Sequence, residues 1–252
     1  MNSTMILPSI GRVPRVPLAI GVLLIASGLV HLAILIGTGA SWAGPLSWRK
    51  PMAFGFSFGV TVITIAWIAS FLRLTDRWRT RIVGVFTIAC AFETVLVSLQ
   101  TWRGVPSHFN IETPMNAVIA RSLAFGGAVL VVMLVTLTIA SFRENPAVPV
   151  SMRVAIRIGL VALLGAQAVG GLMIAKGMTL VTAGDPQGAY ATGGALKPSH
   201  AVTMHAIQLL PIVAWLLSLV DWPERRRLTV VVLIAAAYVV VVVLVIARNV
   251  AS

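Results

Sequence analysis

The chain has 252 residues, of which 58% are hydrophobic and only 10% are charged. A soluble domain carries about 25% charged residues, so this chain has too few charges to cover a surface that faces water. A net charge of +12 would suggest nucleic-acid binding in a soluble protein. Here, however, the basic residues stand mostly at the ends of apolar runs, a pattern that sets membrane topology. Composition and charge therefore predict an integral membrane protein with no nucleic-acid partner.

The apolar runs also indicate the type of secondary structure. Barrel strands alternate apolar and polar residues, whereas the run 230–246 is apolar on every face. Helices satisfy their own backbone polar groups inside a membrane, so we predict an all-α fold. The single cysteine, Cys90, lies within an apolar run. One cysteine cannot form an internal disulfide or a dithiol redox pair, which excludes disulfide-exchange enzymes.

Seven runs are long enough to span a bilayer, which takes about 20 apolar residues. The first run follows Arg12 and Arg15, as in a signal peptide, but it exceeds the about 7–15 apolar residues of such a peptide. We therefore expect an uncleaved first helix and one polytopic domain, 1–252. The predicted transmembrane helices are about 17–38, 53–73, 82–101, 116–141, 154–176, 200–220 and 228–247.

Lysine and arginine are unevenly divided between the two sides of these helices. Twelve of the 19 lie within the segments 12–15, 73–81, 143–157 and 225–227, which share one side. Because cytoplasmic loops carry an excess of Lys and Arg, we predict a cytoplasmic N-terminus and an extracytoplasmic C-terminus in a cell membrane.

The loops of the predicted outer side are longer and richer in turn residues. The last of them, 177–199, contains Gly184-Asp185-Pro186-Gln187-Gly188 and reads as a turn-rich lid or a flexible loop. Loops placed by a rigid scaffold often carry function.

Ionisable and amide side chains recur within the predicted spans at a similar depth. Charged groups inside a membrane are costly and usually face a bundle interior or a cavity. From the helical rise, Glu93 lies roughly 12 Å and Arg121 roughly 9 Å below the outer helix ends. We therefore predict a pocket that opens to the outer face and binds a cofactor, a small molecule or a lipid. Its predicted lining is His31, Glu93, Gln100, Arg121, Gln167, His205 and Gln208.

Basic residues stand at the rim of this predicted pocket. Trp48-Arg49-Lys50-Pro51 enters the second helix, and Trp102-Arg103 leaves the third. Cations at such a rim can hold a propionate, a phosphate or a lipid head. The candidate cofactor-binding residues are His31, His205, Arg49, Arg103 and His108, and the candidate substrate-binding residues are Gln100, Gln167, Gln208 and Asn110.

Three functions from different classes fit these residues. In a haem redox protein, His31 and His205 would be the axial ligands. In a metal-dependent hydrolase, His31, His205 and Glu93 would form an open zinc site, and Arg121 would stabilise an oxyanion. Glu93 and Arg121 are then the catalytic candidates. A transporter or a lipid-binding protein would use the same groups without a cofactor.

The same residues also have purely structural interpretations. Glu93 and Arg121 match in depth and would form an ion pair. His31 would be a neutral histidine bonded to Ser27 or to a neighbouring helix, and Gln167 and Gln208 would link helices. Trp48 and Trp102 would be interface anchors. The sequence leaves these alternatives open.

Two further features concern the sixth helix. His200 and His205 are five residues apart, so on a regular helix they point about 140° away from each other. Pro211 removes a helical hydrogen bond and frees the carbonyl of Ile207. We therefore expect a kink one turn below His205.

Overall fold

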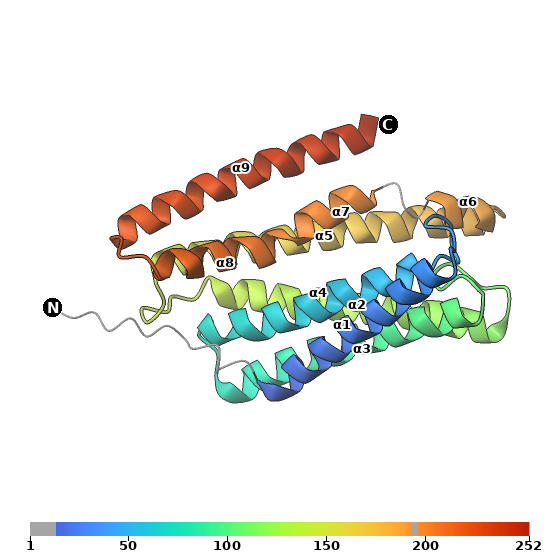
Figure 1. The fold of residues 1–252 in the computed structure, drawn as a ribbon, viewed down its shortest axis with the longest axis horizontal. Coiled ribbons are helices and arrows are strands. Elements are labelled where there is room, and N and C mark those ends of the chain that lie inside the picture. The colour runs from blue at the N-terminus through green and yellow to red at the C-terminus, as the bar shows by residue number, and fades with distance from the viewer. Residues whose placement is uncertain (1–13, 193–195, 252) are drawn as a thin grey trace.

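The computed structural model describes residues 14–192 and 196–251, and this part of the chain is helical, without strands. It contains seven helical segments long and apolar enough to cross a membrane, which confirms the all-α, multi-pass architecture (Figure 1). The elements are α1 (Arg15–Gly37), α2 (Arg49–Ile68), the 3-10 helix η2 (Ala69–Phe71), α3 (Asp76–Trp102), α4 (Pro114–Ser141), α5 (Val150–Thr182), α6 (Pro186–Thr192), α7 (Lys197–Met204), α8 (Ala206–Ser218) and α9 (Glu224–Ala251).

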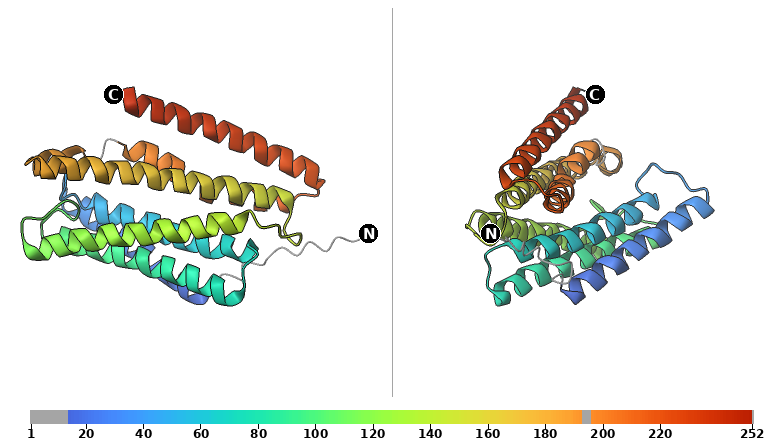
Figure 2. Two further views of the ribbon diagram at one scale, coloured as in Figure 1. Left: turned by 180° about the vertical axis from the view of Figure 1, so that it is seen from behind. Right: turned by 60° about the vertical axis from the view of Figure 1, so that its left-hand side comes forward.

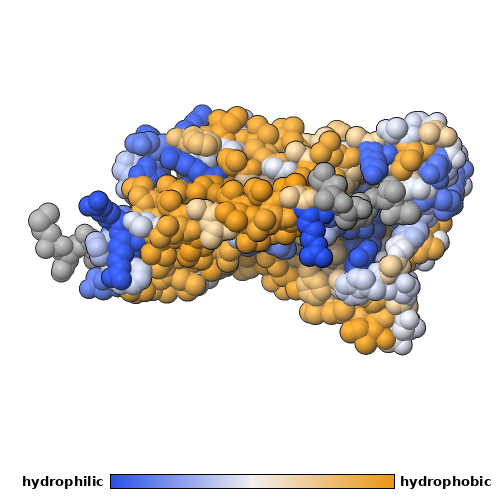
Figure 3. Space-filling model, turned by 90° about the horizontal axis from the view of Figure 1, so that it is seen from above, coloured by the Kyte–Doolittle hydropathy of each residue, from blue (hydrophilic) through white to orange (hydrophobic). Residues whose placement is uncertain are grey.

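The spanning helices run along one common direction, so their connections gather at two ends (Figure 1). The segments 38–48, 103–113 and 183–192 form what we call the loop-rich end. The segments 72–75, 142–149 and 219–223 form the basic end. Hydrophilic residues gather at both ends and a continuous hydrophobic band lies between them (Figure 3), as expected for a chain that crosses a bilayer.

Helices α1 and α2 approach each other through glycines. A Cβ atom at Gly55 would lie 2.6 Å from the carbonyl oxygen of Leu24 and 2.8 Å from the Cα of Gly28. A Cβ atom at Gly59 would lie 2.6 Å from the carbonyl oxygen of Gly21. Glycines four residues apart let two backbones meet in a membrane, where van der Waals packing drives helix association. These positions therefore fix the α1–α2 contact.

The remaining helices pack less evenly. Consecutive helices from α1 to α4 contact one another, and α5 packs against α4, α7, α8 and α9. The main core includes the buried side chains of Ile65, Phe86, Leu160 and Ile207. Helix α9 diverges from α7 and α8 toward its C-terminal end (Figures 1 and 2). Most of its described side chains are therefore partly or fully exposed.

The sixth spanning segment is interrupted at His205, because helix α7 ends at Met204 and α8 begins at Ala206. Pro211, where the sequence predicts a kink, lies inside α8. In an unbroken helix the carbonyl of Val202 would accept the Ala206 N–H. Instead, Tyr238 of α9 donates its hydroxyl to that carbonyl at 2.6 Å. A side chain from another helix thus satisfies the acceptor that the break frees.

The segment predicted as an outer loop, 177–199, is largely helical where it is described. Helix α5 has 33 residues and so extends about 50 Å, beyond the roughly 30 Å of a bilayer core. Its last turns therefore project past the membrane at the loop-rich end, where α6 lies beside them (Figure 1). Gly184 turns the chain with φ +84°, and the Asp185 carboxylate accepts the Gly188 N–H at 2.7 Å.

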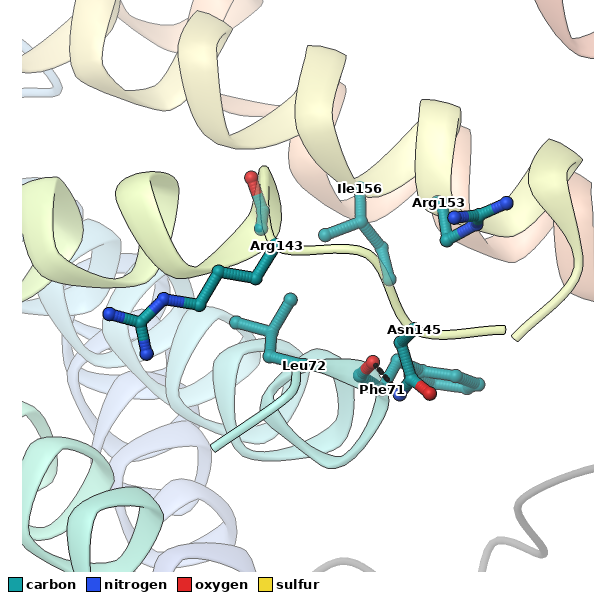
Figure 4. A pocket seen from close by; sticks show the side chains of 7 residues that line it. Phe71, Leu72, Arg143, Asn145, Arg153 and Ile156 are labelled. Carbon is teal, nitrogen blue, oxygen red and sulfur yellow. Dashed lines mark hydrogen bonds between the residues drawn. The ribbon is translucent and has the colours of Figure 1, made fainter. Parts of the chain in front are cut away.

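A small pocket at the basic end lies between the end of η2 and the α4–α5 connection (Figure 4). Its volume is about 10 Å³, room for little more than one water molecule. The Asn145 side-chain amide donates to the Phe71 carbonyl at 2.9 Å, and Arg153 pairs with Glu144 at 3.8 Å. These contacts describe a structural joint rather than a ligand site.

Candidate functional site

His31 lies in an aromatic cluster between three helices. Its Nδ1 donates to the Ser27 carbonyl at 2.7 Å, and its Nε2 accepts from the Trp102 indole N–H at 3.2 Å. The Trp48 ring stacks on it with 6.0 Å between centroids. A neutral imidazole has one donor and one acceptor, and both are in use. This geometry agrees with a structural histidine bonded to Ser27, and a haem iron or metal ion would have to displace a partner.

Glu93 and Arg121 point in different directions. The Glu93 side chain is buried against α4, where a Cβ atom at Gly126 would come within 2.5 Å of its Oε1. This oxygen has no hydrogen-bond partner among the described residues. Arg121 is exposed, and the described part of the chain shows no ion pair between the two. Their matched depth in the sequence does not bring their charges together.

Gln100 and Arg103 join the end of α3 to the start of α4. The Arg103 guanidinium donates to the side-chain oxygen of Gln100 and, at 3.0 Å, to the side-chain oxygen of Asn116. Gln100 in turn donates to Asn116 at 3.2 Å. Gln100 and Asn116 are buried. The sequence reasoning missed Asn116, whose only local signal is its place behind the Thr113 cap of α4.

Gln208 of α8 makes contacts separate from the preceding ones. The Gln208 amide lies 3.2 Å from both Thr61 Oγ1 of α2 and His205 Nδ1. His205 is exposed at the break between α7 and α8. Gln167 is half-buried on α5 and makes no side-chain hydrogen bond to another described residue. Gln208 therefore links helices, as its structural interpretation predicts.

The predicted zinc ligands are not assembled. Within residues 14–192 and 196–251, no three His, Cys, Asp or Glu side chains are close enough together to hold a metal ion. His31, Glu93 and His205 therefore do not form the expected three-ligand set. The residues predicted to line one pocket make separate contacts. His31 bonds to Trp102, and Glu93 packs against α4. Gln100 bonds to Asn116, and Gln208 bonds to Thr61.

Positive charge accumulates at the loop-rich end in a group that we call the cationic cluster: Arg49, Lys50, Lys197 and the neighbouring His108. Arg49 and Lys50 are the first residues of α2, and Lys197 is the first residue of α7. Neither helix has an acidic residue in its first turn or a side-chain cap. The positive end of each helix dipole thus adds to the cations. Arg49, Lys50 and Lys197 have no ion pair with a described residue.

His108 lies in the electric field of the cluster's two lysines. Its burial, followed by the charges of Lys50 and Lys197, holds its pKa well below its ordinary value, so the imidazole is neutral at pH 7. The Ser107 hydroxyl lies 3.0 Å from its Nδ1, and its ring meets Phe54 edge-on with 6.0 Å between centroids. The neutral ring limits the repulsion but leaves the lysines without a counter-charge.

The α3–α4 loop that carries His108 is held firmly. Phe109 adopts φ +66°, and its ring fills the space over Gly177 of α5, where a Cβ atom would lie 2.5 Å from Phe109 Cζ. Asn110 is fully buried and accepts the Glu112 N–H at 3.1 Å. Packing of a loop residue against α5 explains why a bulky residue holds a strained conformation.

Three buried polar atoms at this end lack partners among the described residues: Asn110 Nδ2, Tyr190 Oη and Ser199 Oγ. A buried polar group without a partner costs about 1–3 kcal/mol. Burial, followed by the charge of Glu112, also raises the pKa of Tyr190, so the phenol keeps its proton. Each of the three groups can donate a hydrogen bond to an added acceptor.

No protein family, curated protein or solved structure matches this chain. Its seven spans support a multi-pass membrane protein, and its chemistry has to be inferred from its own residues. The cationic cluster is one group of charges without an ion pair to a described residue. Sequence reasoning found Arg49 and His108 there, but it weighed Lys197 only for topology. The signal was the Lys197-Pro198 pair, because proline is favoured in the first turn of a helix.

Proposed function

We propose that the protein binds a phosphate-class anion at the cationic cluster and needs no haem or metal for this. The observation that carries the proposal is that three cations at two uncapped helix N-termini lie near enough for their charges to interact, without a carboxylate partner in the described residues. Like charges repel, and the repulsion strengthens away from bulk water. A bound anion would turn this repulsion into attraction.

Each member of the cluster supplies a different contact. Arg49 offers a planar guanidinium that suits paired hydrogen bonds to two oxygens, whereas Lys50 and Lys197 act as point charges. The start of α7 supplies backbone N–H donors of the kind that bind anions at helix N-termini, whereas the N–H groups of Arg49 and Lys50 at the start of α2 already donate to Ser47. Ser199, the third residue of α7, adds a hydroxyl. Three cations favour a doubly charged phosphate over a singly charged carboxylate.

The phosphate group has two sources, a small anion in water or the head of a lipid. Both reach the ends of membrane-spanning helices, where the cluster lies. Binding of radiolabelled inorganic phosphate to the purified chain in neutral detergent tests the first source. Native mass spectrometry of the chain released from bilayers of phosphatidylcholine with phosphatidylglycerol tests the second.

Lysine variants provide the decisive comparison. Lys50→Gln and Lys197→Gln each remove one charge from the cluster, and we expect each to weaken binding about tenfold. The matched control is Lys176→Gln, because Lys176 is an exposed lysine of α5 outside the cluster. Equal binding in the three variants, or no binding of either probe by the wild type, contradicts the proposal.

Transport of the same anion is a second candidate function. The break between α7 and α8 favours it, because many transporters bind substrates at interrupted helices, and α7 carries Lys197 at its start. Phosphate uptake into proteoliposomes, lost in Lys197→Gln and kept in Lys176→Gln, would support transport. Binding without uptake would leave the protein as a binding protein.

A further inference from the structure

A groove runs between α5, α9 and the interrupted segment α7–α8. It arises because α9 diverges from the helices beside it (Figure 1). Its volume is about 410 Å³ and the surface it exposes is apolar. The side chains that line it include Val161, Ala162, Ala206, Leu210, Tyr238 and Val239. We call this hollow the α9 groove.

Arg157 also lines the groove, through the carbon atoms of its side chain, since the surface exposed there is apolar. Arg157 of α5 donates from Nε to the Ser141 carbonyl at 2.9 Å, and its guanidinium lies 5.5 Å from the centre of the Phe142 ring. These contacts hold the side chain at the last residues of α4, toward the basic end. A guanidinium has five N–H donors, and only Nε donates to a described residue. The remaining donors are available to a ligand.

The combination of an apolar groove and an arginine points to one class of ligand. We infer that the α9 groove binds a phospholipid, with an acyl chain between α5 and α9 and the phosphate on Arg157. Side chains that line an empty groove lack van der Waals contacts on one side, and an acyl chain supplies those contacts. Arginine is well suited to phosphate because it donates two parallel hydrogen bonds.

A second copy of the chain is a poorer occupant of the groove. It would have to supply an anion to Arg157, but most acidic residues near the basic end already have partners. Asp76 pairs with Arg79, Glu144 with Arg153 and Glu224 with Arg227. A lipid phosphate needs no such rearrangement, because headgroups lie at the same level as the helix ends.

Adjacent valines of α9 provide a matched test. Val239 lines the groove, whereas Val240 does not, and both are more than half exposed. A tryptophan at either position therefore fits outside the core. Val239→Trp would fill the groove, and we expect it to lower lipid retention about tenfold while Val240→Trp keeps it. The probe is palmitoyl-oleoyl phosphatidylglycerol, counted by native mass spectrometry after release from nanodiscs.

A second pair of variants tests the phosphate contact. Arg157→Gln should weaken retention about tenfold. The control is Arg81→Gln, because Arg81 also packs over an aromatic ring, that of Trp78 at 5.6 Å, but lies outside the groove. Lys50→Gln should leave this lipid bound, so the groove and the cationic cluster can fail separately.

Two results would overturn the inference. One is equal retention of the lipid by Val239→Trp and Val240→Trp. The other is a wild-type dimer that Val239→Trp dissociates and Val240→Trp preserves, since a second copy would then occupy the groove. The inference is supported if Val239→Trp and Arg157→Gln lose the lipid while the control variants Val240→Trp, Arg81→Gln and Lys50→Gln keep it.

Discussion

The two ends of the bundle carry similar residues in different states. At the basic end several arginines have partners: Arg79 pairs with Asp76 at 2.6 Å and also donates to the carbonyls of Ala69 and Leu74. Arg153 pairs with Glu144. At the loop-rich end, Lys50 and Lys197 have no ion pair with a described residue. Positive residues at one end thus hold the fold together, whereas at the other they repel.

This difference separates topology from binding. A count of Lys and Arg favours the basic end as the positive one, and that count is the usual guide to orientation. It does not identify where charge is available to a ligand. The loop-rich end has fewer basic residues, yet its cations lie at uncapped helix starts. Pairing, rather than number, distinguishes a candidate site from a structural joint.

The largest effect on stability is expected from Arg79→Ala. This change removes an ion pair, the side-chain donor to the Leu74 carbonyl and one of the two donors to the Ala69 carbonyl, which should cost about 3 kcal/mol of unfolding free energy. Unfolding in mixed micelles with increasing dodecyl sulfate would measure it. Arg77→Ala is the control, because Arg77 is exposed and has no ion pair with a described residue. A loss for Arg79→Ala no larger than the loss for Arg77→Ala would contradict the contrast between the ends.

Lys50→Gln should have the opposite sign. Removal of one cation from a helix N-terminus relieves repulsion, and we expect a gain of about 1 kcal/mol in phosphate-free buffer. Added phosphate should stabilise the wild type more than the variant, because a ligand stabilises only the state that binds it. The same micelle unfolding experiment, with and without phosphate, tests both statements. A variant less stable than the wild type in the absence of phosphate would indicate that Lys50 is a structural residue.

The smallest effect is a change in pH dependence at His108. Its pKa is lowered in the folded state, so the unfolded state binds more protons between that pKa and the ordinary value of about 6.5. Stability should therefore fall as the pH drops below about 6.5. In His108→Gln this fall should be smaller, since Lys50 and Lys197 remain but the titrating ring is gone. Equal slopes in phosphate-free buffer would show that other groups control the pH response.

The spans could be predicted from the sequence because hydropathy over about 20 residues depends on the bilayer and not on neighbours. Side-chain partners could not, because they depend on how each helix is rotated about its axis. Glu93 and Arg121 illustrate this: their depths match, yet one faces α4 and the other is exposed. The interruption at His205 was not predicted either. The Val202 carbonyl beside it accepts from Tyr238, which lies on a different helix.

Within the candidate site, the rim was easier to predict than the interior. Arg49, Lys50 and His108 were found because they stand at helix ends, where sequence position fixes spatial level. His31 was predicted as a ligand, but its Nε2 accepts a hydrogen bond from Trp102, which is 71 residues away. Lys197 was separated from Lys50 by even more of the chain. Their charges act on each other only in the folded chain.

The glycine contact between α1 and α2 bears on how the chain is made. The two helices are consecutive and meet along their lengths through Gly21, Gly28, Gly55 and Gly59. Contacts between neighbouring segments form early, because little chain has to be ordered to close them. The α1–α2 hairpin can therefore assemble in the bilayer while the later helices are still being synthesised. It would give α3 a finished surface to dock on during insertion.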